Sequence, residues 1–155
     1  MSKRLIAAGA SMLISSGIAQ AQGIHISPAG TPATMIGAAQ NFSGHVAVDI
    51  KAAGDSAQQG SVGMVDFAPG ARTAWHTHPV GQLLVVTDGK GWIQQDGQAR
   101  QNIQAGDVVW IDADVRHWHG AAATTGMRHM AVTYLKNGKN ADWKELVSDA
   151  QYNPR

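Results

Sequence analysis

Residues 75–82 decide the fold of this chain and read Trp-His-Thr-His-Pro-Val-Gly-Gln. Successive side chains of a β-strand point to opposite faces, so His76 and His78 are expected to project from the same face of one strand. Two neighbouring imidazoles placed in this way can bind a single metal ion. Gln82 follows a Pro-Val-Gly turn and begins the next predicted strand. Taken alone, this pair of histidines is also compatible with ordinary polar residues at the end of a strand.

A second pair of histidines, His117 and His119, has the same spacing and again flanks a tryptophan. The chain contains seven histidines, and four of them fall in these two pairs. Imidazole is a common ligand of divalent transition metals. Two His-x-His pairs in a β-rich sequence therefore predict a metal centre.

Short runs of strand-forming residues alternate with turn signals from Phe42 onward. The turn signals are Pro69-Gly70, Asp88-Gly89, Asp96-Gly97 and Gly106-Asp107. The predicted strands are His45–Lys51, Val62–Phe67, Thr73–His76, Gln82–Thr87, Gly91–Gln95, Ala99–Ile103, Val108–Ile111, His117–Ala121 and Met127–Tyr134. Many short strands at this spacing predict an all-β sandwich or barrel.

The last segment has a helical rather than a strand-like pattern. Asn140 is a suitable N-cap, and Trp143, Leu146 and Val147 share one face of a helix. The pattern predicts a short C-terminal helix that packs on the outside of the barrel.

The N-terminal residues have the pattern of a secretory signal. Lys3 and Arg4 precede an apolar run from Leu5 to Ile18, and Ala-Gln-Ala at residues 19–21 resembles a cleavage site. A run this short does not span about 30 Å of hydrocarbon as a helix. Residues 1–21 are therefore predicted to be a cleaved signal peptide. The mature protein is predicted to be exported to the periplasm without a membrane anchor.

Two further segments follow the predicted signal. Residues 22–41 are rich in Gly, Pro, Ser, Thr and Ala and are predicted to form an extended N-terminal arm. Residues 42–155 are predicted to form one domain, since 155 residues suffice for a single core. The net charge of +1 argues against nucleic-acid binding, and the absence of cysteine excludes disulfides and thiol chemistry.

The spacing of the histidines resembles the two motifs of the cupin superfamily. The first motif is matched by Gly70, His76, His78, Gln82 and Gly89, and the second by Gly106 and His117, with Asp112 and Asp114 at the usual Pro and Gly positions. The resemblance implies an all-β cupin double-stranded β-helix, or jelly-roll, barrel. It also implies that His76, His78, Gln82 and His117 bind one divalent metal ion.

Gln82 stands where most cupins have Glu. Because the amide is neutral, it leaves the full charge on a divalent ion, which strengthens the polarisation of a bound oxygen and disfavours oxidation of the ion. Gln82 therefore favours Lewis-acid chemistry over oxygen activation, although a neutral ligand in a weak metal site is the plainer interpretation.

A narrower resemblance is carried by residues 69–79, by His-Trp-His-Gly-Ala at 117–121 and by Asp-Trp at 142–143. These phrases are similar to small bacterial cupins that include the manganese-dependent hydroxynitrile lyases. The resemblance implies reversible cleavage of an aromatic cyanohydrin to an aldehyde and hydrogen cyanide, with Mn(II) favoured. Fe(II), Ni(II), Zn(II) and Cu(II) stay open, as do a metal-dependent dioxygenase and a non-catalytic cupin that binds a small ligand. A homodimer or homotetramer is implied by the same resemblance.

His119 and His129 are the candidate catalytic residues, because an imidazole transfers protons in both directions near neutral pH. Gly63, Val65 and Thr133 are candidate substrate-binding positions on the same faces, although packing explains them equally well. The substrate is expected to be a small molecule.

Three other side chains are assigned structural roles. Trp75 and Trp118 alternate with the histidines, so they are expected to face away from the metal and to belong to a core or an interface. Arg72 is expected to form a salt bridge at the rim of the barrel.

Overall fold

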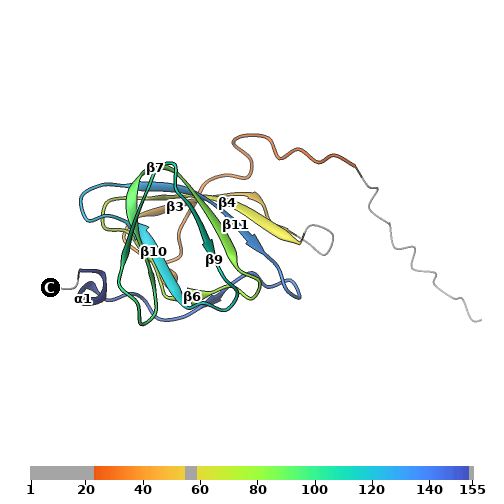
Figure 1. Ribbon diagram of the computed structural model, residues 1–155. Coiled ribbons are helices and arrows are strands. Elements are labelled where there is room, and N and C mark those ends of the chain that lie inside the picture. The colour runs from red at the N-terminus through yellow and green to blue at the C-terminus, as the bar shows by residue number, and fades with distance from the viewer. Residues whose placement is uncertain (1–22, 55–58, 154–155) are drawn as a thin grey trace, which may run out of the picture.

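The computed structural model describes residues 23–54 and 59–153. These residues form twelve strands and one short helix, and the strands join into a curled antiparallel sheet (Figure 1). The elements are β1 (Met35–Ile36), β2 (Phe42–Ser43), β3 (Val46–Ala52), β4 (Gly60–Phe67), β5 (Arg72–Thr73), β6 (His76–Thr77), β7 (Gln82–Gln95), β8 (Gln101–Gln104), β9 (Val108–Ile111), β10 (His117–Ala121), β11 (Met127–Tyr134), β12 (Asp142–Trp143) and α1 (Asp149–Tyr152).

Strand β7 joins the two halves of the sheet. Its first half, from Gln82, pairs with β11 and β9, and its second half, up to Gln95, pairs with β10 and β8. The main path through the sheet runs β1-β3-β4-β11-β7-β10-β5-β2. The prediction of an all-β jelly-roll barrel is confirmed, and one short C-terminal helix is present.

The turn predicted at Asp88-Gly89 was wrong, because β7 continues through it. Gly89 has φ +70°, which lets the strand bend without ending, and the pairing of β11 with β7 shifts register between Arg128 and His129. A Cβ on Gly89 would lie 2.0 Å from the carbonyl oxygen of Gly126. This close approach of two backbones explains why glycine occupies the bend. The strand continues through the bend because β7 stays paired with β11 at Asp88 and Gly89.

Two apolar clusters lie on the two faces of the sheet. The inner cluster contains residues such as Val46, Phe67 and Leu84. The outer cluster contains Trp75, Trp118, Val147 and Tyr152. The prediction that the two tryptophans face away from the histidines is confirmed, and it follows from the alternation of side chains along a strand.

The helix predicted after Asn140 was wrong in its position. Residues 142–143 form β12, which pairs with β6, and the amide of Lys144 continues the ladder by donating to the carbonyl of Trp75 at 2.8 Å. Pairing with a distant strand has overridden the local helical period. The helix α1 begins after Ser148, whose side chain forms a capping box with Gln151.

Arg72 anchors the C-terminal segment to the barrel, as predicted for a rim salt bridge. Its buried guanidinium donates to the carbonyl oxygen of Val147 at 2.8 and 3.2 Å and pairs with the Asp149 carboxylate at 2.7 Å. The guanidinium also lies 4.5 Å from the centre of the Tyr152 ring. The segment that covers the outer cluster is thereby held in place.

The predicted signal peptide lies outside the described residues. In the predicted N-terminal arm, Met35 and Ile36 pair with β3, while Ile24 and Ile26 are exposed. The boundaries drawn at residues 21 and 41 stay predictions. In the part of the chain that the structure describes, no helix is long and apolar enough to cross a membrane.

Candidate metal centre

The inner face of the barrel encloses a cavity of about 530 Å³ that opens at one end. Its lining includes six predicted site residues that bear donor atoms: His76, His78, Gln82, His119, His129 and Thr133. The predicted ligand His117 is not among its lining residues. His76 lies on β6, and His117 on β10 is its direct partner across the antiparallel pairing. The fold therefore brings the two histidine pairs together, although His76 and His117 are 41 positions apart in the sequence.

Three of the histidines are held by the same kind of hydrogen bond. The Nδ1 atom of His76 lies 2.9 Å from the carbonyl oxygen of Ala74, that of His78 lies 2.6 Å from Asn140, and that of His117 lies 2.9 Å from Val115. A carbonyl oxygen only accepts, so each Nδ1 carries the proton. The Nε2 lone pair of each ring is therefore free for a metal ion, an arrangement typical of metal-binding histidines.

Gln82 is oriented by a different contact. Its Nε2 donates to Thr133 Oγ1 at 2.9 Å, which identifies the other atom of the amide as the free acceptor Oε1. Oε1 is buried and has no hydrogen-bond partner, and the same is true of Nε2 in His78, His117 and His119. Buried lone pairs without partners are costly, so these atoms fit a bound cation.

The donor atoms of His76, His117 and His119 lie within 4.8 Å of one another. All three side chains are buried, and this spacing suits one metal ion. The barrel therefore holds a cluster of buried histidines that could bind one metal ion. His119, which the sequence analysis predicted to be a catalytic residue, lies within this group. Its Nδ1 atom distinguishes it from the other histidines.

His119 differs from the other histidines in its Nδ1 contact. Its Nδ1 lies 3.2 Å from Nε2 of His129 rather than against a carbonyl oxygen. The backbone amide of His119 donates to Thr73 Oγ1 at 3.1 Å, and the Phe67 ring lies 5.9 Å from the His119 ring and 5.4 Å from the His129 ring. The two imidazoles form a buried pair at the wall of the cavity that can hold and pass one proton.

Burial lowers the pKa of all five site histidines. The pKa of His117 and of His129 falls to about 4, and burial with the neighbouring His117 and His78 lowers that of His76 well below its usual value. Burial likewise lowers the pKa of His78, and burial together with His129 lowers that of His119. The rings are therefore neutral at neutral pH, which is the form that binds metals and accepts protons.

The predicted substrate-binding positions Gly63, Val65 and Thr133 all line the cavity. The sequence did not reveal two aromatic residues at the same cavity, Phe42 and Trp143. Phe42 was placed at the border of the arm, and Trp143 on one face of a helix packed on the outside of the barrel. The only sequence signal for either residue was the Asp-Trp at positions 142–143, which contributed to the family resemblance but was assigned no function.

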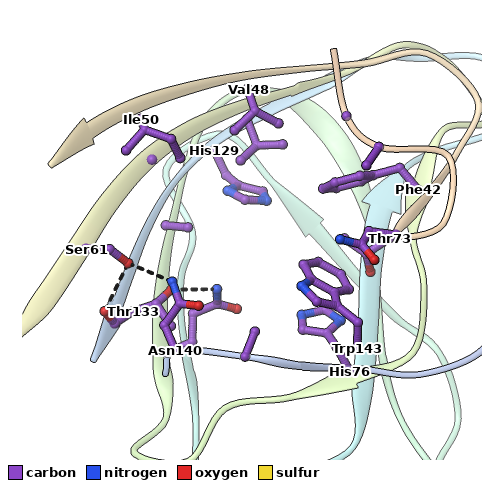
Figure 2. A pocket seen from close by; sticks show the side chains of 18 of the residues that line it. Phe42, Val48, Ile50, Ser61, Thr73, His76, His129, Thr133, Asn140 and Trp143 are labelled. Carbon is purple, nitrogen blue, oxygen red and sulfur yellow. Dashed lines mark hydrogen bonds between the residues drawn. The ribbon is translucent and has the colours of Figure 1, made fainter. Parts of the chain in front are cut away.

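The polar residues Ser61 and Asn140 also line the cavity and were not singled out by the sequence. Asn140 Nδ2 donates to Ser61 Oγ at 3.2 Å, and Ser61 Oγ donates to the carbonyl oxygen of Thr133 at 3.2 Å (Figure 2). Asn140 was predicted to cap a helix, but its carbonyl oxygen instead orients His78.

A curled antiparallel barrel with neutral, buried histidines around one cavity defines a metal-binding β-barrel protein. A family model described as a cupin domain matches residues 63–133. The (R)-mandelonitrile lyase of Granulicella tundricola is 48% identical over 130 residues, covering 83% of this chain and 98% of that protein. The chain therefore belongs to the cupin family.

Solved structures agree with this assignment. A cupin-like protein of Thermotoga maritima has a TM-score of 0.72 at 37% identity, with 76% of this chain and 89% of that chain covered. A cupin 2 conserved barrel domain protein of Rhodopseudomonas palustris has a TM-score of 0.59 at 16% identity, with 72% and 76% covered. The second likeness concerns the fold alone.

Proposed function

We propose that this protein is a metal-dependent hydroxynitrile lyase that reversibly cleaves an aromatic cyanohydrin to an aldehyde and hydrogen cyanide. The observation that carries the proposal is the buried histidine pair, His119 and His129, beside a metal site in a cavity of about 530 Å³. The 48% identity to an (R)-mandelonitrile lyase supports the same reaction. The predicted substrate is accordingly a small molecule such as mandelonitrile.

The proposed metal ligands are His76, His78, Gln82 and His117. The three histidines share the Nδ1 contact to a backbone carbonyl oxygen, which leaves Nε2 of each ring free to bind the ion. Gln82 contributes its unpartnered Oε1. His119 is assigned to proton transfer rather than to the metal because the resemblance to the cupin motifs does not include it among the ligands and its Nδ1 lies against another imidazole. Mn(II) is the proposed ion, by resemblance to the manganese-dependent members.

The reaction needs a proton to move from the hydroxyl of the cyanohydrin to the departing cyanide. When bound, a divalent ion supplies Lewis acidity that lowers the pKa of a hydroxyl. The pair formed by His119 and His129 accepts that proton through a neutral ring nitrogen. The carbon–carbon bond then breaks, its electron pair leaves with cyanide, and return of the proton yields hydrogen cyanide and the aldehyde.

The deciding experiment follows benzaldehyde formation from mandelonitrile by manganese-loaded protein, with metal-stripped protein as the control. We expect turnover only in the loaded protein. If no aldehyde forms above the control, the lyase proposal is wrong. Oxygen uptake with a catechol or flavonol would then favour a dioxygenase, and binding without turnover would favour a ligand-binding cupin.

We also propose that residues 1–21 direct export to the periplasm and that the mature protein is a homodimer or homotetramer. The basic residues, apolar run and Ala-Gln-Ala site support export. The mass of the protein recovered from a periplasmic fraction tests the cleavage, and its mass in solution tests the assembly. Elemental analysis of the same sample identifies the metal.

A further inference from the structure

The cavity has an aromatic side and a polar side. Figure 2 shows Phe42 and Trp143 on one side, and Ser61, Thr133 and Asn140 on the other. Asn140 donates to Ser61, Ser61 donates to the carbonyl oxygen of Thr133, and Thr133 Oγ1 accepts from Gln82. A ligand with one flat apolar group and one polar group would therefore be oriented by the cavity.

Trp143 forms the outer part of the aromatic side. The β12–β6 pairing places it opposite His76, and its indole stacks on that imidazole with 4.7 Å between ring centres and 29° between planes. The Phe42 ring lies 5.5 Å from the Trp143 ring at 55°. Trp143 is 38% exposed although it lines the cavity, so part of its surface is free to contact a ligand at the opening.

The aromatic side extends inward to the histidine pair. The rings of Phe42 and Phe67 lie 6.3 Å apart at 56°, and Phe67 in turn lies 5.4 Å from His129. Tilted contacts of this kind are those that aromatic rings prefer. The aromatic side therefore reaches from His76, which stacks on Trp143, to His129, which contacts Phe67.

We propose that Trp143 and Phe42 hold the aromatic ring of the substrate and make the site selective for flat aromatic cyanohydrins over saturated ones. Trp143 is then a specificity-determining residue. The inference rests on the proposed lyase function for the identity of the substrate, whereas the ring-binding role is independent of turnover. Val48 and Ile50, which also line the cavity (Figure 2), offer an aliphatic surface that lacks this preference for flat rings.

The test compares binding of two unreactive alcohols, benzyl alcohol and cyclohexylmethanol, to the metal-loaded protein by ligand-observed NMR titration. Both have a six-membered ring on a CH₂OH group, and only the first is flat and aromatic. We expect tighter binding of benzyl alcohol, and we expect Trp143→Leu to reduce this preference about three- to tenfold, the value of one aromatic pair. Trp143→Phe should retain the preference.

The matched control is Trp110→Leu, because Trp110 is 54% exposed and does not line this cavity. Metal content is measured for each variant, since Trp143 stacks on His76. An unchanged preference in Trp143→Leu, an equal loss in Trp110→Leu, or no preference in the original protein overturns the inference.

Mandelonitrile turnover by the same samples separates the two proposals. A preference for benzyl alcohol that depends on Trp143, without turnover, overturns the lyase proposal and supports the proposal that Trp143 and Phe42 bind the ring. Turnover without this preference overturns only the proposal that Trp143 and Phe42 bind the ring. In a protein that has both, Trp143→Leu should raise KM for mandelonitrile more than it lowers kcat.

Discussion

His119 Nδ1 and His129 Nε2 lie 3.2 Å apart in the interior of the barrel. The two residues come from β10 and β11, which pair with different halves of β7. Since neither ring is more than 3% exposed, solvent competes poorly for this contact. The pair therefore links the two halves of the sheet at the place where the proposed proton transfer occurs.

Replacing His129 by Asn should abolish most of the lyase activity without removing the metal. General acid–base groups contribute about 10²- to 10⁴-fold to a rate, so kcat for mandelonitrile should fall by that factor. Steady-state kinetics and elemental analysis of the same samples test this. His45→Asn, which changes an exposed histidine outside the cavity, is the control. A decrease of less than about tenfold would show that His129 is not the proton-transfer residue.

Replacing Gln82 by Glu should strengthen metal binding and weaken lyase activity. The added carboxylate charge attracts the divalent ion but reduces the polarisation of a bound hydroxyl. Competition with a chelator measures the metal affinity, and mandelonitrile cleavage measures the activity. Thr133→Val is the companion variant, since it removes the oxygen that accepts from Gln82 at 2.9 Å and should lower the metal affinity about 10- to 100-fold. Equal or higher activity in the Glu variant would contradict the assigned role of the neutral amide.

The metal-free protein should lose stability as the pH falls below about 6.5. The folded-state pKa values of His117 and His129 are lowered to about 4, so the unfolded chain binds more protons between these pH values. The free energy of unfolding should therefore decrease toward pH 4 by up to about 1.4 kcal/mol per pH unit for each histidine. Urea unfolding at pH 7, 6 and 5 measures the slope. His129→Leu should have a shallower slope, and parallel slopes would refute this cause.

Replacing Gly89 by Ala should destabilise the fold more than the same change at Gly97. Both have positive φ, +70° and +74°, but a Cβ on Gly89 would lie 2.0 Å from Gly126 O, whereas one on Gly97 meets nothing within 4 Å. Gly97→Ala should cost about 1–2 kcal/mol from backbone strain alone. Gly89→Ala should cost about 2–5 kcal/mol because the backbone must also move. Denaturant unfolding of both variants tests the difference, and similar costs would argue against the close approach.

The sequence by itself determined most of the longer strands and the side of each strand on which the histidines lie. Alternation along a strand is a local property, so two positions of separation suffice to place His76 with His78 and to turn Trp75 and Trp118 away from them. The same alternation brought Gly63, Val65 and Thr133 to the cavity. The sequence also identifies the candidate ligand at position 82 as a neutral amide rather than a carboxylate.

Only the tertiary structure decided the contacts between distant segments. The carbonyl oxygen that orients His78 comes from Asn140, 62 residues away, and residues 142–143 became a strand because β6 offered them backbone partners. Trp143 reached the cavity through that pairing. Local periodicity contains no information about such partners, because their hydrogen bonds form only after the chain has closed the intervening loops.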